Sequence, residues 1–171
     1  MRKFRVVVAD PPWAFRDSLP GKANWRGAAK HYPLMLTRDI GLMELPPIAD
    51  DALLFLWRVS SMQREALMVC QMWGFEPYGE MVWQKLTVRG NPVMGMGRVT
   101  RNGHESVLIG RRGRPVIRDH TVRSIFAAPV GRHSEKPELF FDMVQRLARG
   151  PYLELFARRQ RDGWTCMGDE L

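Results

Sequence analysis

The stretch RVVVADPPWAF, residues 5–15, changes character abruptly at its centre. Its first half is short, apolar and β-branched, which predicts a buried strand over residues 4–9. Asp10 follows at once, and after it come two prolines and Trp13. Proline has a fixed φ and no backbone N–H, so neither a strand ladder nor a helix continues through this point. The stretch therefore predicts a buried strand that ends in a rigid segment carrying an acid and an indole.

Strand and helix patterns alternate along the rest of the chain. The run ALLFLWRV, residues 52–59, is apolar almost throughout, which is typical of a parallel strand covered on both faces. The next segment, residues 60–74, has helical spacing, a capping box formed by Ser60 and Gln63, and Gly74 as its stop. Further strands are predicted at residues 77–85, 105–112, 124–130 and 152–159, and further helices at residues 37–45 and 134–150.

This alternation predicts a single α/β domain over residues 1–171, with a mostly parallel sheet and helices on both faces. In such sheets ligands bind beyond the carboxyl ends of the strands, and Asp10 lies at one such end. Residues 14–36 and 86–104 are rich in glycine and basic residues, and we interpret them as two long loops. Gly95 and Gly97, in the second loop, are interpreted as a source of flexibility and not as a phosphate-binding turn.

The chain is strongly basic. Its net charge of +8 favours a polyanion such as nucleic acid as the partner, with a merely basic surface as the alternative. Cys70 and Cys166 are far apart, and the histidines lack metal-binding spacing, so we expect neither a disulfide framework nor a metal site. No apolar run approaches the ~18 residues of a membrane span, and the amino terminus lacks the apolar core of a signal peptide. We therefore expect a cytoplasmic protein with no membrane partner.

The DPPW segment offers hydrogen-bond acceptors beside a flat ring. Asp10 supplies a carboxylate, and the carbonyls at Pro11 and Pro12 are expected to be free of ladder or helix bonds. Such a set suits the amino group of adenine, because accepting both N–H bonds would aim the nitrogen lone pair at an electrophilic methyl group. Trp13 would stack on an unpaired or flipped base. The alternative is a rigid Asp-Pro-Pro turn with Trp13 filling the core.

The whole chain from about residue 4 resembles one branch of the amino-directed adenine N6-methyltransferases that use S-adenosylmethionine. DPPW after a hydrophobic strand is similar to their catalytic signature. That branch contains the catalytic subunit of eukaryotic mRNA N6-adenosine methyltransferase and its bacterial and phage relatives. The further segments that match it, in order, are ALLFLW, MWGFE, MVWQK, GRHSEKPELF and LELFARRQRDGWTCMGDE. The resemblance implies a permuted Rossmann-like fold in which the catalytic motif precedes the cofactor strand.

The resemblance also implies a cofactor site for S-adenosylmethionine. Asp10 would bond the amino group of the methionine moiety, and Lys136 would face its carboxylate. The alternative for Lys136 is a solvated residue in the first turn of a helix, where a cation opposes the helix dipole. Arg158 would reach the ribose hydroxyls and adenine of the cofactor, and Glu154 is either a further cofactor ligand or a structural partner of Arg158.

Near the end of the chain, Asp169 and Glu170 take the place where mRNA-modifying members commonly have Asn-Gln. The resemblance assigns them to the cofactor hydroxyls, and carboxylates are good acceptors for such groups. Fraying of the chain end is the alternative.

The loops 14–36 and 86–104 would gate the pocket and contact the substrate backbone. Tyr32 is a candidate second aromatic near the base, Arg98 a candidate substrate contact, and Lys85 faces either the site or solvent. The other basic residues of these loops are Arg16, Lys22, Arg26, Lys30, His31, Arg89 and Arg101. A solvated basic surface is the alternative for each of them.

Together these observations predict a methyltransferase acting on the N6 amine of adenine in nucleic acid. DNA is preferred because the chain has no added RNA-binding or partner-binding segments. An RNA adenine N6-methyltransferase and a catalytically silent nucleic-acid-binding partner subunit are the alternatives. Because no separate target-recognition domain is present, specificity would be short, or borrowed from a second subunit or a second copy in a homodimer.

Overall fold

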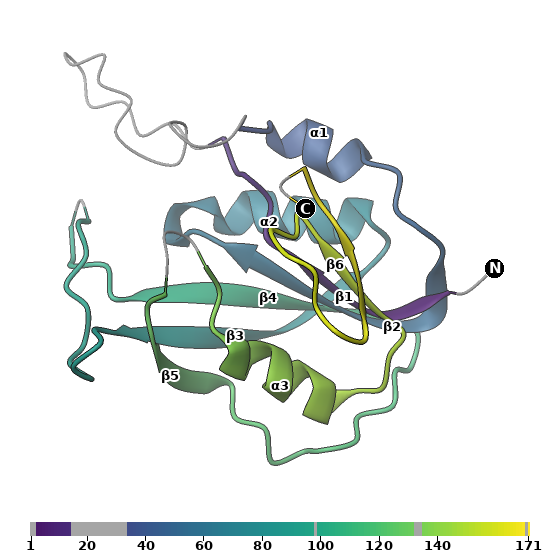
Figure 1. The fold of residues 1–171 in the computed structure, drawn as a ribbon. Coiled ribbons are helices and arrows are strands. Elements are labelled where there is room, and N and C mark those ends of the chain that lie inside the picture. Colours follow the sequence, from purple (N-terminus) through teal and green to yellow (C-terminus); the bar gives the residue numbers. More distant parts are fainter. Residues whose placement is uncertain (1–2, 15–33, 98, 132–134, 170) are drawn as a thin grey trace.

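The computed structural model describes residues 3–14, 34–97, 99–131, 135–169 and 171. Within these residues, seven strands form one sheet in the order β5-β3-β4-β2-β1-β6-β7 (Figure 1). The strands are β1 Phe4–Ala9, β2 Ile48–Arg58, β3 Glu76–Leu86, β4 His104–Arg112, β5 Ile125–Pro129, β6 Tyr152–Leu155 and β7 Trp164–Met167. Strand β4 is antiparallel to both of its neighbours, and the other strand pairs are parallel. The predicted α/β class with a mostly parallel sheet is confirmed.

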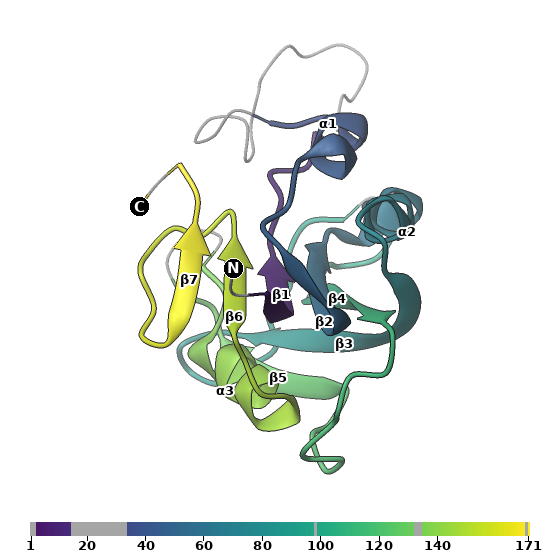
Figure 2. The ribbon, with the colours of Figure 1, turned by 90° about the vertical axis from the view of Figure 1, so that its right-hand side faces the viewer.

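Helices cover both faces of the sheet, as the sequence predicts. Helices α1 (Thr37–Leu42) and α2 (Gln63–Met72) lie on one face, and α3 (Glu138–Leu147) lies on the other (Figures 1 and 2). Successive residues of β1 face the two layers, since Val7 packs with α1 and α2 while Val8 packs with α3. This two-sided burial explains the continuous apolar runs. No helix in the described part of the chain is long and apolar enough to cross a membrane.

Two helix starts differ from their predicted positions. Ser60–Met62 forms a 3-10 turn, and α2 begins at Gln63 without a side-chain cap, so the predicted capping box is wrong. The tighter turn leads the chain into the helix instead. Helix α3 begins at Glu138, after an extended Pro137, and not at residue 134. The predicted end of α2 is confirmed by Gly74, whose φ of 76° ends a helix.

The register of the sheet brings several strand ends together beside Asp10. Strand β1 lies between β2 and β6, with Ala9 opposite Leu56 on one side and Leu155 on the other. Asp10 therefore leaves the sheet beside the carboxyl ends of two parallel strands. Because β4 runs the opposite way, its amino end at His104 reaches the same edge. This carboxyl edge is where the candidate site lies.

Phe140 is a central side chain of the layer between α3 and the sheet. Its ring is fully buried and makes edge contacts with Phe55 and Trp57, with ring centroids 6.1 and 4.7 Å away. Removing it leaves a cavity beneath α3, so Phe140→Ala is expected to lower the free energy of unfolding by about 3–5 kcal/mol in urea titrations. The control Leu139→Ala, at a residue that is 43% exposed, is expected to change it by about 0.5 kcal/mol or less. Equal losses in the two variants would contradict this account of the core.

Candidate active site

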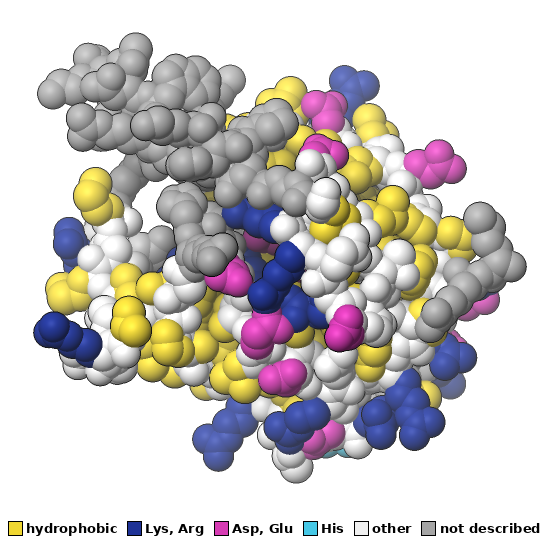
Figure 3. All heavy atoms as spheres, viewed as in Figure 1, with side chains coloured by type: hydrophobic (Ala, Val, Ile, Leu, Met, Phe, Trp, Pro, Cys, Tyr) yellow, Lys and Arg dark blue, Asp and Glu magenta, His cyan; other side chains and the backbone are white. Residues whose placement is uncertain are grey.

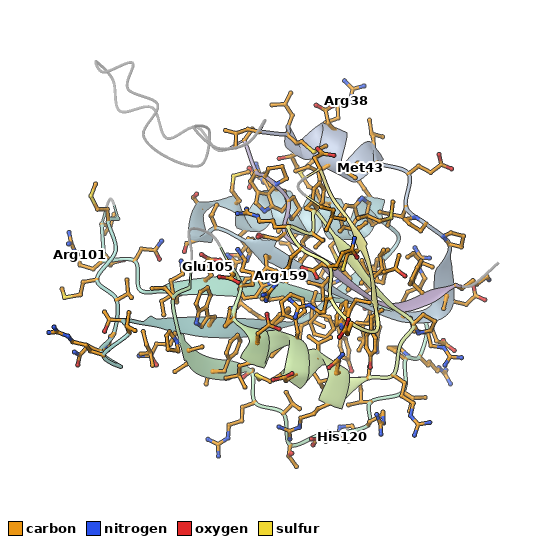
Figure 4. All side chains as sticks on the ribbon, viewed as in Figure 1. Arg38, Met43, Arg101, Glu105, His120 and Arg159 are labelled. Carbon is orange, nitrogen blue, oxygen red and sulfur yellow. The ribbon has the colours of Figure 1, made fainter. Side chains whose placement is uncertain are left out.

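A network of four charged side chains with alternating sign lies at the carboxyl edge of the sheet. The Nζ atom of Lys136 lies 2.8 Å from Oδ2 of Asp10 and 3.1 Å from Oε2 of Glu105. The other carboxylate oxygen of Glu105 pairs with Lys85. We call these four residues the charge network. They come from the end of β1, the segment before α3, the start of β4 and the end of β3, so the fold joins four distant parts of the chain here (Figure 4 labels Glu105).

Lys136 is the central cation of the charge network. Its side chain is only 11% exposed, and burial by itself lowers the pKa of an ammonium group. The charges and hydrogen bonds of Asp10 and Glu105 outweigh this effect, so the net shift raises the pKa of Lys136. The Nζ atom also lies 5.0 Å from the centroid of the Trp57 ring, a cation–π contact. Two carboxylates of the chain therefore face Lys136, and its contact with the carboxylate of a methyl donor stays a prediction.

Glu105 is a site residue that the sequence did not indicate. Burial raises the pKa of its carboxyl group, but the ammonium groups of Lys136 and Lys85 together outweigh burial, and the net shift lowers this pKa. Lys85, predicted to face either the site or solvent, faces the site through this pair. The run ESVLIGRR was predicted as a strand, but its direction was not. Only the antiparallel direction of β4 brings the first residues of that run to the carboxyl edge.

The carbonyls of the proline segment are not free, contrary to the sequence-based expectation. The N–H of Trp13 donates to the Pro11 carbonyl over 2.8 Å, and the N–H of Met35 donates to the Pro12 carbonyl over the same distance. Trp13 forms a parallel bridge with Met35, and the sequence pattern did not predict the donor that Met35 supplies. A carbonyl oxygen has a second lone pair, so each can still accept one further bond.

Trp13 does not present a free face for stacking in this structure. Its ring is 4% exposed, it packs in the core with α1 and α2, and its Nε1–H donates to the Trp57 carbonyl over 2.9 Å. A buried indole needs such an acceptor, and the end of β2 provides it. The alternative interpretation, in which Trp13 fills the core and fixes the turn, therefore describes this conformation better than the stacking platform does.

Glu154 belongs to the same edge, on β6. Its Oε2 lies 3.4 Å from Nε of Arg161 and 3.9 Å from Sγ of Cys166. Burial raises the pKa of Glu154, the negative charge of Asp10 raises it further, and Arg161 opposes both effects without cancelling them. Glu154 is therefore within electrostatic reach of Asp10. Arg161, its ion-pair partner, was not singled out from the sequence.

The segment before α3 is held by a second group of ion pairs. Arg159 pairs with Glu135 over 3.4 Å and also with Glu138, and Arg161 pairs with Glu138 as well. These bonds join the chain after β6 to the first turn of α3, directly beside Lys136. Figure 3 shows acidic and basic side chains next to one another at the centre of this face, and Figure 4 labels Arg159 there. The position of Lys136 is thus fixed from both sides.

The remaining predicted cofactor residues follow the ends of β6 and β7. Arg158 is half-buried and Asp169 is exposed, and parallel pairing of the two strands puts both residues at the carboxyl edge. Phe156, just after β6, has a φ of 59°, an unusual backbone for a non-glycine residue that is often seen at functional sites. Tyr32, Arg98 and Glu170 lie outside the described residues. The described residues contain no group of His, Cys, Asp or Glu side chains arranged to hold a metal.

Comparisons with known proteins indicate the family of the chain. The family model described as MT-A70 matches residues 4–170. An N(6)-adenosine-methyltransferase MT-A70-like protein of Arabidopsis thaliana is 31% identical over 98% of this chain and 24% of its own length. The N(6)-adenosine-methyltransferase catalytic subunit METTL3 of Homo sapiens is 30% identical over 99% of this chain and 28% of its own. The type II methyltransferase M.MunI of Mycoplasma sp is 30% identical over 99% of this chain and 78% of its own.

The α/β sheet carries the DPPW segment at its carboxyl edge, and methyltransferases match nearly the whole chain. Fold, motif and matches together define the class of protein as a methyltransferase. The chain belongs to the MT-A70 family. It spans about a quarter of the length of the eukaryotic relatives named above. The predicted resemblance to the family that contains both the mRNA methyltransferase subunit and bacterial enzymes is confirmed.

The lowered pKa of Glu105 predicts a loss of stability in acid. Folding favours the ionised carboxylate of Glu105, which therefore stabilises the folded state. This stabilisation is complete above the ordinary carboxyl pKa of 4.5, and it is lost as the pH falls through the lowered pKa of the folded state. Glu105→Gln is therefore expected to reduce the pH dependence of the unfolding free energy below about pH 5, measured by urea titrations at several pH values. Glu76→Gln, which removes an exposed partner of Arg111, serves as the control. An unchanged acid dependence in Glu105→Gln would contradict the assignment.

Proposed function

We propose that this chain transfers a methyl group from S-adenosylmethionine to the N6 amine of adenine in nucleic acid, with DNA as the first choice of polymer. The observation that carries the proposal is Asp10, which stands at the carboxyl edge with its carboxylate held by Lys136 and with the Pro11 and Pro12 carbonyls beside it in sequence. Membership of the MT-A70 family supports the reaction, and the net charge of +8 supports a polyanionic substrate.

The charge network fits the methionine end of the proposed donor. That end carries an ammonium group and a carboxylate, which match the carboxylate of Asp10 and the ammonium of Lys136. Glu154, Arg158 and Asp169 would hold the nucleoside end, where hydroxyls and ring nitrogens need acceptors and donors. When bound, the donor supplies an electrophilic methyl group on a sulfonium ion.

The residues of this chain would position the amine and stabilise its charge. Asp10 accepts one N–H bond of the adenine amine, and the Pro11 carbonyl accepts the other through its second lone pair. The amine nitrogen would gain positive charge as it takes the methyl carbon from the donor sulfur, which would leave as a neutral thioether, and the nearby carboxylate of Asp10 would stabilise that charge. The nitrogen then loses one proton, for which Asp10 is the positioned acceptor. Lys136 and Glu105 keep the Asp10 carboxylate oriented throughout.

The permuted Rossmann-like arrangement is part of the proposal. Strand β1, with the catalytic motif, comes first in the chain, whereas its neighbour β6, which would face the cofactor, comes near the end. DNA is the first choice of polymer and RNA the alternative, since an N(6)-adenosine-methyltransferase and a type II methyltransferase match the chain at the same 30% identity.

The direct test is transfer of a labelled methyl group from S-adenosylmethionine to single- and double-stranded DNA and RNA. Mass spectrometry of the digested products is expected to show N6-methyladenine, and Asp10→Asn is expected to lower the rate at least 100-fold, because an amide stabilises positive charge poorly. Asp39→Asn, at an exposed acid in α1, is the control and should leave the rate unchanged. Normal turnover by Asp10→Asn would disprove the mechanism.

Donor binding gives a second test that does not depend on turnover. Lys136→Met removes the cation proposed to face the donor carboxylate, so the dissociation constant for S-adenosylmethionine is expected to rise by about 10- to 100-fold in calorimetric titrations. Lys3→Met, which removes an exposed lysine at the other edge of the sheet, is the control. Unchanged affinity in Lys136→Met would show that the donor does not contact this residue.

A further inference from the structure

The segment between β3 and β4 forms a built projection, which we call the finger and define as residues 87–97 and 99–103. Its backbone is joined across two turns: the N–H of Gly90 donates to the Thr87 carbonyl over 2.9 Å, and Gly95 and Asn102 exchange bonds of 3.0 and 3.2 Å. The finger extends past the carboxyl edge of the sheet (Figure 1). It is the long loop that the sequence predicted, with backbone bonds across two of its turns.

Two glycines of the finger are needed for this close pairing. A Cβ atom added at Gly95 would collide with the Asn102 carbonyl, and one added at Gly97 would collide with the Thr100 carbonyl. The structure adds a steric reason for glycine at these positions to the predicted flexibility. Glycine lets two backbone segments of the finger approach closely.

The root of the finger is attached to the charge network. The N–H of Lys85 donates to the Gly103 carbonyl over 2.9 Å, and the N–H of Val93 donates to the Lys85 carbonyl over the same distance. The side chain of Lys85 pairs with Glu105, which in turn contacts Lys136. The finger thus starts at the site and points away from it, with Arg101 far from Glu105 in Figure 4.

The surface of the finger is apolar and basic. Four large apolar side chains are between 70% and 96% exposed, namely Val88, Met94, Met96 and Val99. Arg89 and Arg101 are exposed beside them, and residues 87–103 contain no Asp or Glu. Figure 3 shows hydrophobic and basic side chains together at this end of the molecule. Exposed apolar side chains on an ordered element indicate a binding surface, and the absence of acids favours a polyanion over a protein.

We propose that the finger is a wedge that enters a paired nucleic acid and fills the space left when the target adenine leaves the stack. The proposal rests on the proposed function, because the N6 amine of a paired adenine is engaged with its partner base and reaches Asp10 only after extrusion. Methionine and other apolar side chains can insert between base pairs and unstack them. Arg89 and Arg101 would contact the phosphates on either side of the gap.

The test compares paired with unpaired substrate. The native protein, the triple variant Met94→Ser/Met96→Ser/Val99→Ser and the control Val116→Ser are assayed for methyl transfer to sheared plasmid DNA, both as duplex and after heat denaturation. Val116 is 79% exposed and follows β4 at the opposite edge, so its replacement removes a similar side chain away from the site. The triple variant is expected to lose at least tenfold in rate on duplex and less than threefold on denatured DNA. The control should match the native protein on both, and circular dichroism verifies that all three proteins are folded.

A second readout does not need methyl transfer. Insertion between base pairs unwinds DNA, so a closed plasmid relaxed by topoisomerase in the presence of native protein should carry a changed linking number after the protein is removed. The triple variant is expected to lose this change and Val116→Ser to retain it. If the native protein changes the linking number, the triple variant does not, and neither methylates any nucleic acid, the wedge is supported and the proposed function is refuted.

Several outcomes would overturn the wedge. Equal losses of the triple variant on duplex and denatured DNA would make the finger a general binding element, and methylation unaffected by the substitutions would remove it from the reaction. If the native protein is a dimer, the triple variant is a monomer and both methylate DNA equally, the finger is a docking surface for a second copy of the chain. A native protein that neither methylates nor unwinds DNA would refute the wedge and the choice of DNA as the polymer, and a native protein that also fails to methylate RNA would refute the proposed function.

Discussion

The buried ammonium group of Lys136 is the constraint on which the carboxyl edge depends. An unpaired ion at this depth would cost several kcal/mol, so it is retained only where the surrounding structure compensates its charge. Asp10 does so from the end of β1, Glu105 from β4 and the face of Trp57 from β2. A shift of β1, β2 or β4 relative to the segment before α3 would leave a charge uncompensated. The same interaction that orders these elements also orients the carboxylate of Asp10.

The chain around the prolines fixes Asp10 from its other side. The backbone of β1 ends in ladder bonds to β2 and β6, and the residues after Asp10 are tied by Trp13 and by Met35. Burial of the Trp13 ring under α1 and α2, with its N–H on the Trp57 carbonyl, prevents the turn from moving as a loop. The acid is therefore held by rigid backbone on both sides, which is the arrangement that positioning a reactive amine requires.

Local signals in the sequence were sufficient for part of the site. The run before Asp10 and the prolines after it indicate a strand end, and the apolar run 52–59 indicates a buried strand. The strand predicted over 152–159 is too long, because β6 ends at Leu155 and Phe156 turns the chain with a φ of 59°. Lys136 was singled out through resemblance as a donor contact, and the structure adds its pairing with Asp10, which the sequence did not indicate. Trp13 was predicted to stack on the base, with burial in the core only as the alternative, because its burial depends on an acceptor at the end of β2, which is remote in sequence. The prediction that the Pro11 and Pro12 carbonyls are free was also wrong. Their donors are the N–H groups of Trp13 and Met35, and the pattern of the DPPW segment does not reveal these bonds.

The reversed direction of β4 is the feature that no local pattern revealed, and it has two consequences. A strand pattern indicates which residues face which layer, but it does not indicate whether the strand runs parallel to its neighbours. Because β4 is antiparallel and follows β3 directly, the connection between them must turn at the carboxyl edge instead of crossing the sheet. That turn forms the finger, and the first residues after it bring Glu105 to Lys136. One reversal therefore places an acid inside the site and an apolar, basic projection directly beside it.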